Sequence, residues 1–139
     1  MTTAAFTKRV ILGVQRAFPR AKLSRMNVGG AVPMDRVRIA MGYIERGDIR
    51  AARSILSRPT AFGVAGLPDI CGLLPVSDAP LGILMGIEVK CGRDYQTKQQ
   101  KVCQRVFAQA GAIYVIADDK TGVDGCVGKI RDWLKERGL

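Results

Sequence analysis

The most informative stretch of this sequence is LGILMGIEVK, residues 81–90. It is apolar as far as Ile87, which predicts a strand buried on both faces. Side chains alternate along a strand, so Glu88 and Lys90 point to one face while Ile87 and Val89 point to the other. A carboxylate and an ammonium group near a buried strand are costly unless they are paired or put to use. The stretch therefore predicts either a satisfied Glu–Lys pair at a strand end or part of a functional site.

A second carboxylate stands at the start of the preceding apolar run. Residues 68–75, PDICGLLP, predict a neighbouring strand buried on both faces, with Asp69 at its beginning. A loop between the two strands can bring Asp69 beside Glu88, and two carboxylates with only Lys90 to neutralise them repel each other unless a divalent cation lies between them. Oxygen ligands suit Mg²⁺ or Mn²⁺, which also accept phosphate oxygens. Taken singly, Asp69 also fits a turn or cap residue after proline.

The rest of the chain predicts a single mixed α/β domain. Helices are expected over residues 3–18, in a hairpin within 33–58, from Thr97 until Gly111, and over about 122–137; strands are expected over 21–28, 68–75, 81–90 and 112–117. Thr97 is the expected N-cap of its helix, with Gln100 completing a capping box. The apolar face of this helix is expected to consist of Val102, Cys103, Val106, Phe107 and Ala110.

The charge of the chain is unevenly spread. The 139 residues carry 22 Lys and Arg against 12 Asp and Glu, a net charge of +10. Residues 1–32 contribute +6, residues 33–58 contribute +3 and residues 59–139 only +1. Clustered cations favour an anionic partner, usually nucleic acid, because neutralising phosphates requires them. A solvated basic surface with a chance asymmetry is the alternative.

Histidine is absent from the sequence. This excludes His-dependent triads, His-ligated zinc and nucleases with a His general base, so any chemistry relies on carboxylates, Lys, Tyr, Ser, Thr, Cys or a metal held by oxygen. The four cysteines lack CxxC spacing, and we expect reduced thiols, mostly in core or strand positions. Neither a signal peptide nor an apolar span of about 18 residues is present, so we expect a cytoplasmic protein without a membrane partner.

The ordered motifs resemble the VRR-NUC branch of the PD-(D/E)xK nuclease superfamily, in the form of a small stand-alone phage or bacterial member. Pro68-Asp69, eighteen intervening residues and Glu88-x-Lys90 match the superfamily pattern. The match to the branch extends over Gly63, Gly66, Ile70, Gly72, Gly86, Thr97 to Gln100 and Gly111-Ala112-x-Tyr114, and more loosely over residues 3–30 through Arg25-x-Asn27. The resemblance implies a restriction-endonuclease-like core, with a mixed central sheet flanked by helices, over a single domain 1–139.

The resemblance also implies catalytic roles. Asp69 and Glu88 would hold Mg²⁺ or Mn²⁺, with the carbonyl oxygen of Val89 as a further ligand. Lys90 would orient or help deprotonate the attacking water and offset charge in the transition state. Gln100 would position the water or Lys90.

Other residues receive less specific assignments. Gln99 is the alternative to Gln100 for the catalytic role. Gln100 also has a purely structural explanation, the capping box with Thr97, and it can fill both roles at once. Nucleic-acid contacts are expected from four arginines: Arg25, Arg36, Arg38 and Arg93.

Two features depart from the family pattern. The family carries a Glu on its opening helix, whereas this chain has no acidic residue before Asp35. Gln15 or a water would take that place, and one metal ion is favoured over two. The second feature is the hairpin at 33–58, which is expected to be an insertion. Three roles are open for its arginines: binding phosphates, lining a subunit interface, or forming only a solvated basic surface. Its expected apolar face consists of Val37, Ala40, Met41, Ile44, Ile49, Ala52, Ile55 and Leu56.

The leading interpretation is a Mg²⁺- or Mn²⁺-dependent endodeoxyribonuclease that acts on branched DNA, in the manner of Holliday-junction resolvases. A homodimer would present two sites to two strands. With aromatic residues at only 6% and no zinc finger or helix-turn-helix signature, recognition of backbone and shape is favoured over base readout. The main alternative is a non-catalytic nucleic-acid-binding module on a degenerate nuclease fold. A sequence-specific restriction-type nuclease is a weaker third, and an RNA substrate stays open.

Overall fold

The chain forms two compact units, residues 1–26 with 65–139 and residues 27–64. The computed structural model describes residues 1–26, 30–31, 34–57, 60–61, 66–76 and 82–139. Several positions used in the sequence patterns lie outside these ranges, namely Asn27, Gly63 and Leu81. Within the described ranges, no helix has the length and apolar character needed to cross a membrane.

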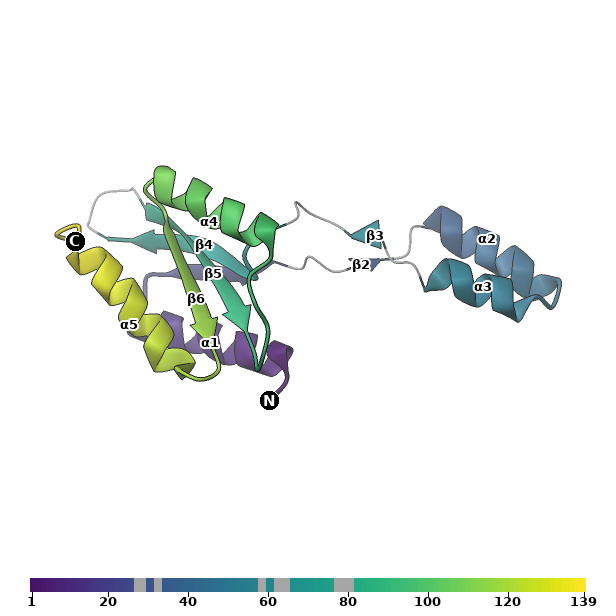
Figure 1. Cartoon of the computed structure of the whole chain (residues 1–139), viewed down its shortest axis with the longest axis horizontal. Helices are drawn as coiled ribbons and strands as arrows, with labels where there is room; N and C mark the ends of the chain where they lie inside the picture. Colours follow the sequence, from purple (N-terminus) through teal and green to yellow (C-terminus); the bar gives the residue numbers. More distant parts are fainter. Residues whose placement is uncertain (27–29, 32–33, 58–59, 62–65, 77–81) are drawn as a thin grey trace. The chain divides into compact units, whose positions relative to one another are not determined.

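The first unit is built on a four-stranded mixed sheet in the order β1-β4-β5-β6 (Figure 1). The strands are β1 (Lys22–Arg25), β4 (Ile70–Pro75), β5 (Gly82–Lys90) and β6 (Ile113–Asp118). β4 runs antiparallel to both β1 and β5, whereas β5 and β6 are parallel because α4 connects them. The predicted α/β class with a mixed sheet is therefore confirmed.

Three helices cover the two faces of this sheet. α1 (Thr3–Ala17) and α5 (Gly122–Lys135) lie on one face, and α4 (Lys98–Gln109) lies on the other (Figure 1). The main core forms under α1 and α5, where side chains at helical spacing meet alternate residues of the strands. Its buried members include Phe6, Val10, Val14, Ile70, Met85, Ile87, Val89, Ile113, Val115, Ala117, Cys126 and Ile130.

A glycine allows the two helices on this face to pack closely. A Cβ on Gly13 of α1 would lie only 2.1 Å from Cγ1 of Val123 in the first turn of α5. No side chain larger than hydrogen fits there without movement of one helix or rotation of the valine. The start of α5 is thereby held against the middle of α1.

The structure corrects the expected burial of two elements. On α4 only Phe107 is buried, while Val102 and Val106 are 48% and 54% exposed. The helix is rotated so that Gln100 and Phe107 face the sheet, and the valines lie on its flank. In the sheet, Leu73 and Leu84 are cross-strand partners on the α4 side and are 52% and 45% exposed. β4 and β5 are therefore not buried on both faces along their whole length.

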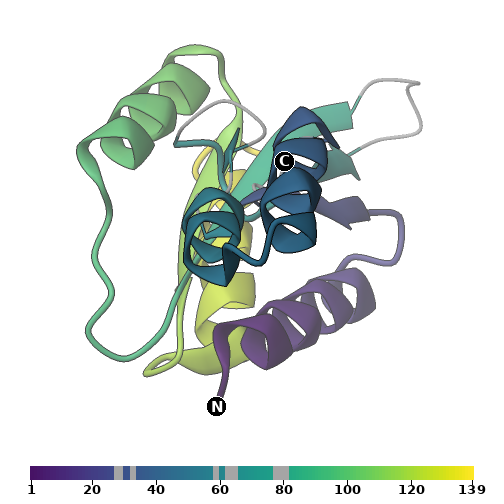
Figure 2. The same cartoon turned by 90° about the vertical axis from the view of Figure 1, so that its right-hand side faces the viewer.

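The second unit contains the predicted helical hairpin and two very short strands that the sequence did not indicate. α2 (Met34–Glu45) and α3 (Ile49–Leu56) lie side by side (Figure 2), and β2 (Gly30–Ala31) pairs antiparallel with β3 (Thr60–Ala61). Gly47, with a φ of 77°, makes the turn, and Asp48 caps α3 by accepting from the backbone N–H of Ala51.

The expected apolar face of this hairpin is largely exposed. Only Ala40 and Ala52 are buried on the two helices. Met41, Ile44, Ile49 and Leu56 are 38–60% exposed. Two short helices in contact have too little shared surface to cover side chains of this size.

The four thiols are free, as expected. Cys71 lies on β4 and Cys126 in the core, which matches the expected positions. Cys103 lies on α4 and Cys91 follows directly after β5. Both are half-buried, so these two thiols lie outside the strands and the core.

Candidate active site

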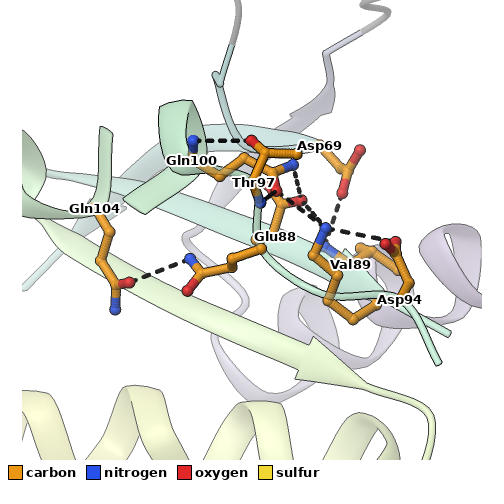
Figure 3. A network of polar contacts seen from close by, with 9 residues as sticks. Asp69, Glu88, Val89, Asp94, Thr97, Gln100 and Gln104 are labelled. Carbon is orange, nitrogen blue, oxygen red and sulfur yellow. Dashed lines mark hydrogen bonds and ion pairs between the residues drawn. The ribbon is translucent and has the colours of Figure 1, made fainter. Parts of the chain in front are cut away.

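The end of β5 places two charged side chains inside the protein. Glu88 and Lys90 are only 1% and 8% exposed, and they share the sheet face that α4 covers. The pairing of Ile70 with Ile87 between β4 and β5 puts Asp69 next to Glu88. Asp69 is fixed there because its Oδ2 accepts a hydrogen bond of 2.8 Å from the backbone N–H of Val89 (Figure 3). Strand alternation and register together create this cluster.

The carboxylate of Glu88 is bonded on one oxygen only. Its Oε1 accepts from Lys90 Nζ at 3.0 Å and from Gln100 Nε2. Its Oε2 is buried and has no hydrogen-bond partner in the described part of the chain. Burial raises the pKa of Glu88, and the charge of Asp69 adds to this, while the hydrogen bond from Lys90 opposes it. A buried acceptor without a donor costs free energy, so this oxygen is suited to a ligand.

The ammonium group of Lys90 has three acceptors around it. They are Glu88 Oε1, Gln100 Oε1 at 3.1 Å and Asp94 Oδ2 at 3.4 Å. Burial acts to lower the pKa of Lys90, but the hydrogen bond and charge of Glu88 and the charge of Asp94 outweigh it, and the pKa lies above its usual value. Lys90 is therefore a fixed positive charge at neutral pH.

The first turn of α4 supplies the amide that joins these groups. The predicted capping box is present: Gln100 N–H donates to Thr97 Oγ1 at 3.2 Å, and Gln100 Oε1 accepts from Thr97 N–H at 2.8 Å. The same side chain bonds both Glu88 and Lys90, so the cap and the site share one residue (Figure 3). Gln100, and not Gln99, makes these contacts in the described structure.

Gly66 brings the segment before Asp69 close to this helix. It has a φ of 91°, and a Cβ there would lie 2.6 Å from the carbonyl carbon of Gln99. Only glycine combines this backbone conformation with such an approach. The contact links the turn that precedes Asp69 to the start of α4.

Sequence reasoning missed Asp94. This residue lies in the loop after β5, and its side chain is 55% exposed while it pairs with Lys90. The loop is held by hydrogen bonds from Asp94 N–H to Cys91 O at 3.1 Å and from Gly92 N–H to Asp119 Oδ2 at 2.9 Å. No periodicity marks a loop residue, so only its position four residues after Lys90 could have drawn attention to it.

Tyr114, which belongs to the motif set, lies beneath α4. Its ring packs edge-on against Phe107 with centroids 5.5 Å apart. Burial, and then the charge of Glu88, raise the pKa of its hydroxyl. Tyr114 therefore borders the carboxylate cluster as a neutral side chain.

The remaining predicted residues lie in four places. Arg25 ends β1 opposite Ile70, next to Asp69, and Arg93 lies in the loop after β5; both are exposed. Arg36 and Arg38 belong to α2 in the second unit. Gln15 lies on α1, and in the described structure it makes no hydrogen bond to Asp69 or Glu88.

The donor set of the cluster fits a hard divalent cation. It offers the unpartnered Glu88 Oε2, the neighbouring Asp69 carboxylate and backbone oxygen, with no thiol or imidazole ligand. Within the described ranges no group of three or more His, Cys, Asp or Glu side chains is arranged to hold a metal. Water and phosphate oxygens would have to complete the shell, which is usual for Mg²⁺.

Comparisons with known proteins find similarity among solved structures. No protein-family model and no curated protein matches the chain. Among solved structures, a chain described as "VRR_NUC domain protein" aligns with a TM-score of 0.36 and 22% sequence identity, over 77% of this chain and 91% of that one. That description carries the name of the family that the sequence motifs resemble.

Proposed function

We propose that this protein is a divalent-metal-dependent DNA endonuclease of the VRR-NUC type, which hydrolyses a phosphodiester by attack of water. The observation that carries the proposal is the buried Glu88 Oε2, which has no hydrogen-bond partner among the described residues, beside Asp69 and the ammonium group of Lys90. Asp69, Glu88 and the carbonyl oxygen of Val89 would hold Mg²⁺ or Mn²⁺. The cation would polarise the phosphate and lower the pKa of the attacking water.

Lys90 acts in this proposal as a charge stabiliser. Its ammonium group is held by Glu88 Oε1, Gln100 Oε1 and Asp94 Oδ2, a position from which it can also orient the attacking water. A fixed ammonium group offsets the negative charge that develops on the phosphate in the transition state. Gln100 is a positioning residue, because it bonds Lys90 and Glu88 at once.

The proposed substrate is branched DNA, bound through its backbone. Arg25 and Arg93 lie exposed on the segments that flank Asp69 and Lys90, where they can contact phosphates. Arg36 and Arg38 on α2 are proposed to add further contacts from the second unit. Phosphate contacts of this kind carry no base-sequence information, which suits a protein that recognises the shape of branched DNA.

We also propose that the protein acts as a homodimer through its hairpin. The exposed apolar side chains of Ile44, Ile49 and Leu56 on α2 and α3 support an interface in the second unit. Sedimentation velocity should give a dimer for the natural chain and a monomer for the Ile44→Ser/Leu56→Ser variant. A monomeric natural chain would remove this part of the proposal.

Cleavage of a labelled four-way junction tests the nuclease assignment. We expect cutting with Mg²⁺ or Mn²⁺, none with a chelator, and none for Asp69→Asn, while the matched control Asp132→Asn, on the exposed side of α5, keeps its activity. Linear duplex and RNA of the same sequence serve as comparison substrates. Faster cutting of the linear duplex at one sequence would favour a restriction-type enzyme.

One observation favours the non-catalytic alternative. The Glu88–Lys90 pair at 3.0 Å, bridged by Gln100, is also what a purely structural buried ion pair needs. Junction binding without cleavage under every divalent ion tried would establish that reading.

A further inference from the structure

A groove of about 700 Å³ runs along the surface where α1 packs against α5, with Gly13 and Val123 among its lining residues. It lies on the helices that cover the sheet face opposite to Glu88 and Lys90. Three arginines line it: Arg9 and Arg16 from α1, and Arg131 from α5. The proposed active site uses none of them.

The charge in this groove is not balanced. Arg9, Arg16 and Arg131 make no ion pair with any described residue, and Arg9 donates a hydrogen bond of 3.3 Å to the sulfur of Met1. Asp124 is the one acidic side chain among the described lining residues. Like charges gathered in a concave surface repel one another, and an anionic ligand would remove that cost.

The start of α5 already has carboxylates around it. Asp118 accepts from the backbone N–H and from the hydroxyl of Thr121, each at 2.9 Å, and Asp124 lies in the first turn. The positive charge of the groove therefore comes from the three guanidinium groups.

The spacing of the arginines suits a nucleic-acid strand. Arg9 and Arg16 are seven residues apart, so they share one side of α1 at about 10 Å along its axis. A DNA strand carries one phosphate per about 3.4 Å of duplex axis, so the pair spans roughly three phosphates. Gly13 lies between them and adds no side chain to the floor of the groove.

The groove and the candidate active site lie near the same edge of the sheet. β5 and β6 are parallel, and their register pairs Lys90 with Asp118. α5 begins at Gly122, just after that point. The α5 end of the groove and the carboxylate cluster therefore lie at the carboxyl edge of the same two strands, on opposite faces.

We infer that the Arg9–Arg16–Arg131 groove binds the phosphate backbone of DNA on the flank of the cleaved position. The identity of the polyanion as DNA rests on the proposed function, whereas the anion site rests on the groove itself. The groove holds the duplex arm while the scissile phosphate lies at the Asp69–Glu88 cluster.

Binding measured without cleavage tests this inference. Fluorescence anisotropy of a labelled junction is followed in EDTA across a salt series, with the full chain and with Arg9→Gln/Arg16→Gln/Arg131→Gln. Each phosphate contact contributes about −0.9 to the slope of log affinity against log salt. Loss of three contacts should therefore make the slope of this variant shallower by roughly 2.7. The variant Arg9→Lys/Arg16→Lys/Arg131→Lys keeps the charges and should retain most of the slope.

A control with the same change in net charge shows whether position matters. Lys101→Gln/Arg105→Gln/Lys135→Gln removes three exposed cations that do not line the groove, and it should leave most of the slope intact. Equal slopes for the two glutamine variants would overturn the inference, as would a natural chain that binds no DNA.

A parallel Mg²⁺ cleavage assay separates the two proposals. If the natural chain cuts DNA while the two glutamine variants bind alike, only the groove assignment fails. If nothing is cut but the groove variant alone loses binding, the nuclease assignment fails and the groove assignment stands. Circular dichroism on each variant verifies that the fold is kept.

Discussion

At the scale of single residues, the site depends on how one carboxylate is shared. Glu88 Oε1 serves both Lys90 and Gln100, which leaves Oε2 buried and without a partner in the described structure. The sequence predicted the shared face of Glu88 and Lys90 from strand alternation, and the Thr97–Gln100 cap from residue types. It did not predict that one amide would serve both, because that contact joins β5 to a helix that begins eight residues later.

Replacing Lys90 should separate chemistry from binding. Lys90→Gln should lower junction cleavage by about 10²–10³-fold, the usual cost of losing one group that stabilises transition-state charge. Junction affinity in EDTA should stay within about threefold, because Lys90 is buried behind Glu88 and Asp94. Single-turnover cleavage and anisotropy measure the two effects.

The control for this substitution is Lys101→Gln, which removes an exposed lysine from α4. It should leave cleavage unchanged. If Lys90→Gln lost affinity and kept its rate at saturating DNA, Lys90 would serve docking and not chemistry.

Asp118 should contribute to stability in a pH-dependent way. Its carboxylate accepts from the backbone N–H of Thr121 at 2.9 Å, from the Thr121 hydroxyl at 2.9 Å and from Lys129 Nζ at 3.4 Å. Mainly through the Thr121 backbone bond, the pKa of Asp118 falls from 3.8 to about 2. In this pH range the unfolded chain binds more protons than the folded chain, so stability rises with pH.

The Asp118 contribution is complete above pH 3.8 and is lost as the pH falls through about 2. Urea unfolding over this range should show a shallower pH dependence for Asp118→Asn than for the natural chain, with Asp132→Asn as matched control. An unchanged pH dependence in Asp118→Asn would refute the assignment.

At the scale of elements, the contact of α1 with α5 should be sensitive to a single methyl group. Gly13→Ala would place Cβ 2.1 Å from Val123 Cγ1, so the valine must rotate or the helices must separate. Overpacking of this kind costs about 1–3 kcal/mol, more than the gain in helix propensity from alanine. Thermal unfolding should show Gly13→Ala to be less stable.

Two further variants make this prediction specific. Adding Val123→Ala should restore part of the lost stability, because the clashing methyl group is removed. Gly128→Ala on α5 has no atom within 4 Å of the new Cβ and should be neutral or stabilising. If Gly13→Ala behaved like Gly128→Ala, the close contact would not exist in solution.

The burial errors of the sequence interpretation also belong to the element scale. Val102 and Val106 were assigned to the buried face of α4 by spacing, yet they are half-exposed. Helical periodicity fixes which residues share a side, but not the angle at which the helix meets a sheet. On α4 the side that faces the sheet is the one that carries Gln100, which contacts Glu88, and Phe107, which contacts Tyr114.

At the scale of the whole molecule, the first unit should fold without the second. Every residue of its core cluster lies in residues 1–26 or 65–139. The chain leaves and re-enters the first unit at neighbouring points, because Met26 N–H donates to Asp69 O at 2.8 Å. A short Gly/Ser linker can therefore replace residues 27–64.

This deletion variant should unfold cooperatively and keep the circular dichroism of a mixed α/β protein. It should bind junctions more weakly, with a smaller salt slope, because the hairpin arginines are lost. Loss of cooperative unfolding would mean that the first unit depends on residues 27–64.

The sequence alone determined the mixed α/β class, the order of the main elements and the grouping of Glu88 with Lys90, because these follow from periods of two to four residues along the chain. It also placed most of the positive charge in the first 58 residues. Only the tertiary structure showed that Arg131 joins Arg9 and Arg16 in one groove, that Asp94 pairs with Lys90 and that Gln100 also bonds Glu88. The physical reason is range: local patterns orient side chains within one element, whereas contacts between distant residues depend on how the elements pack.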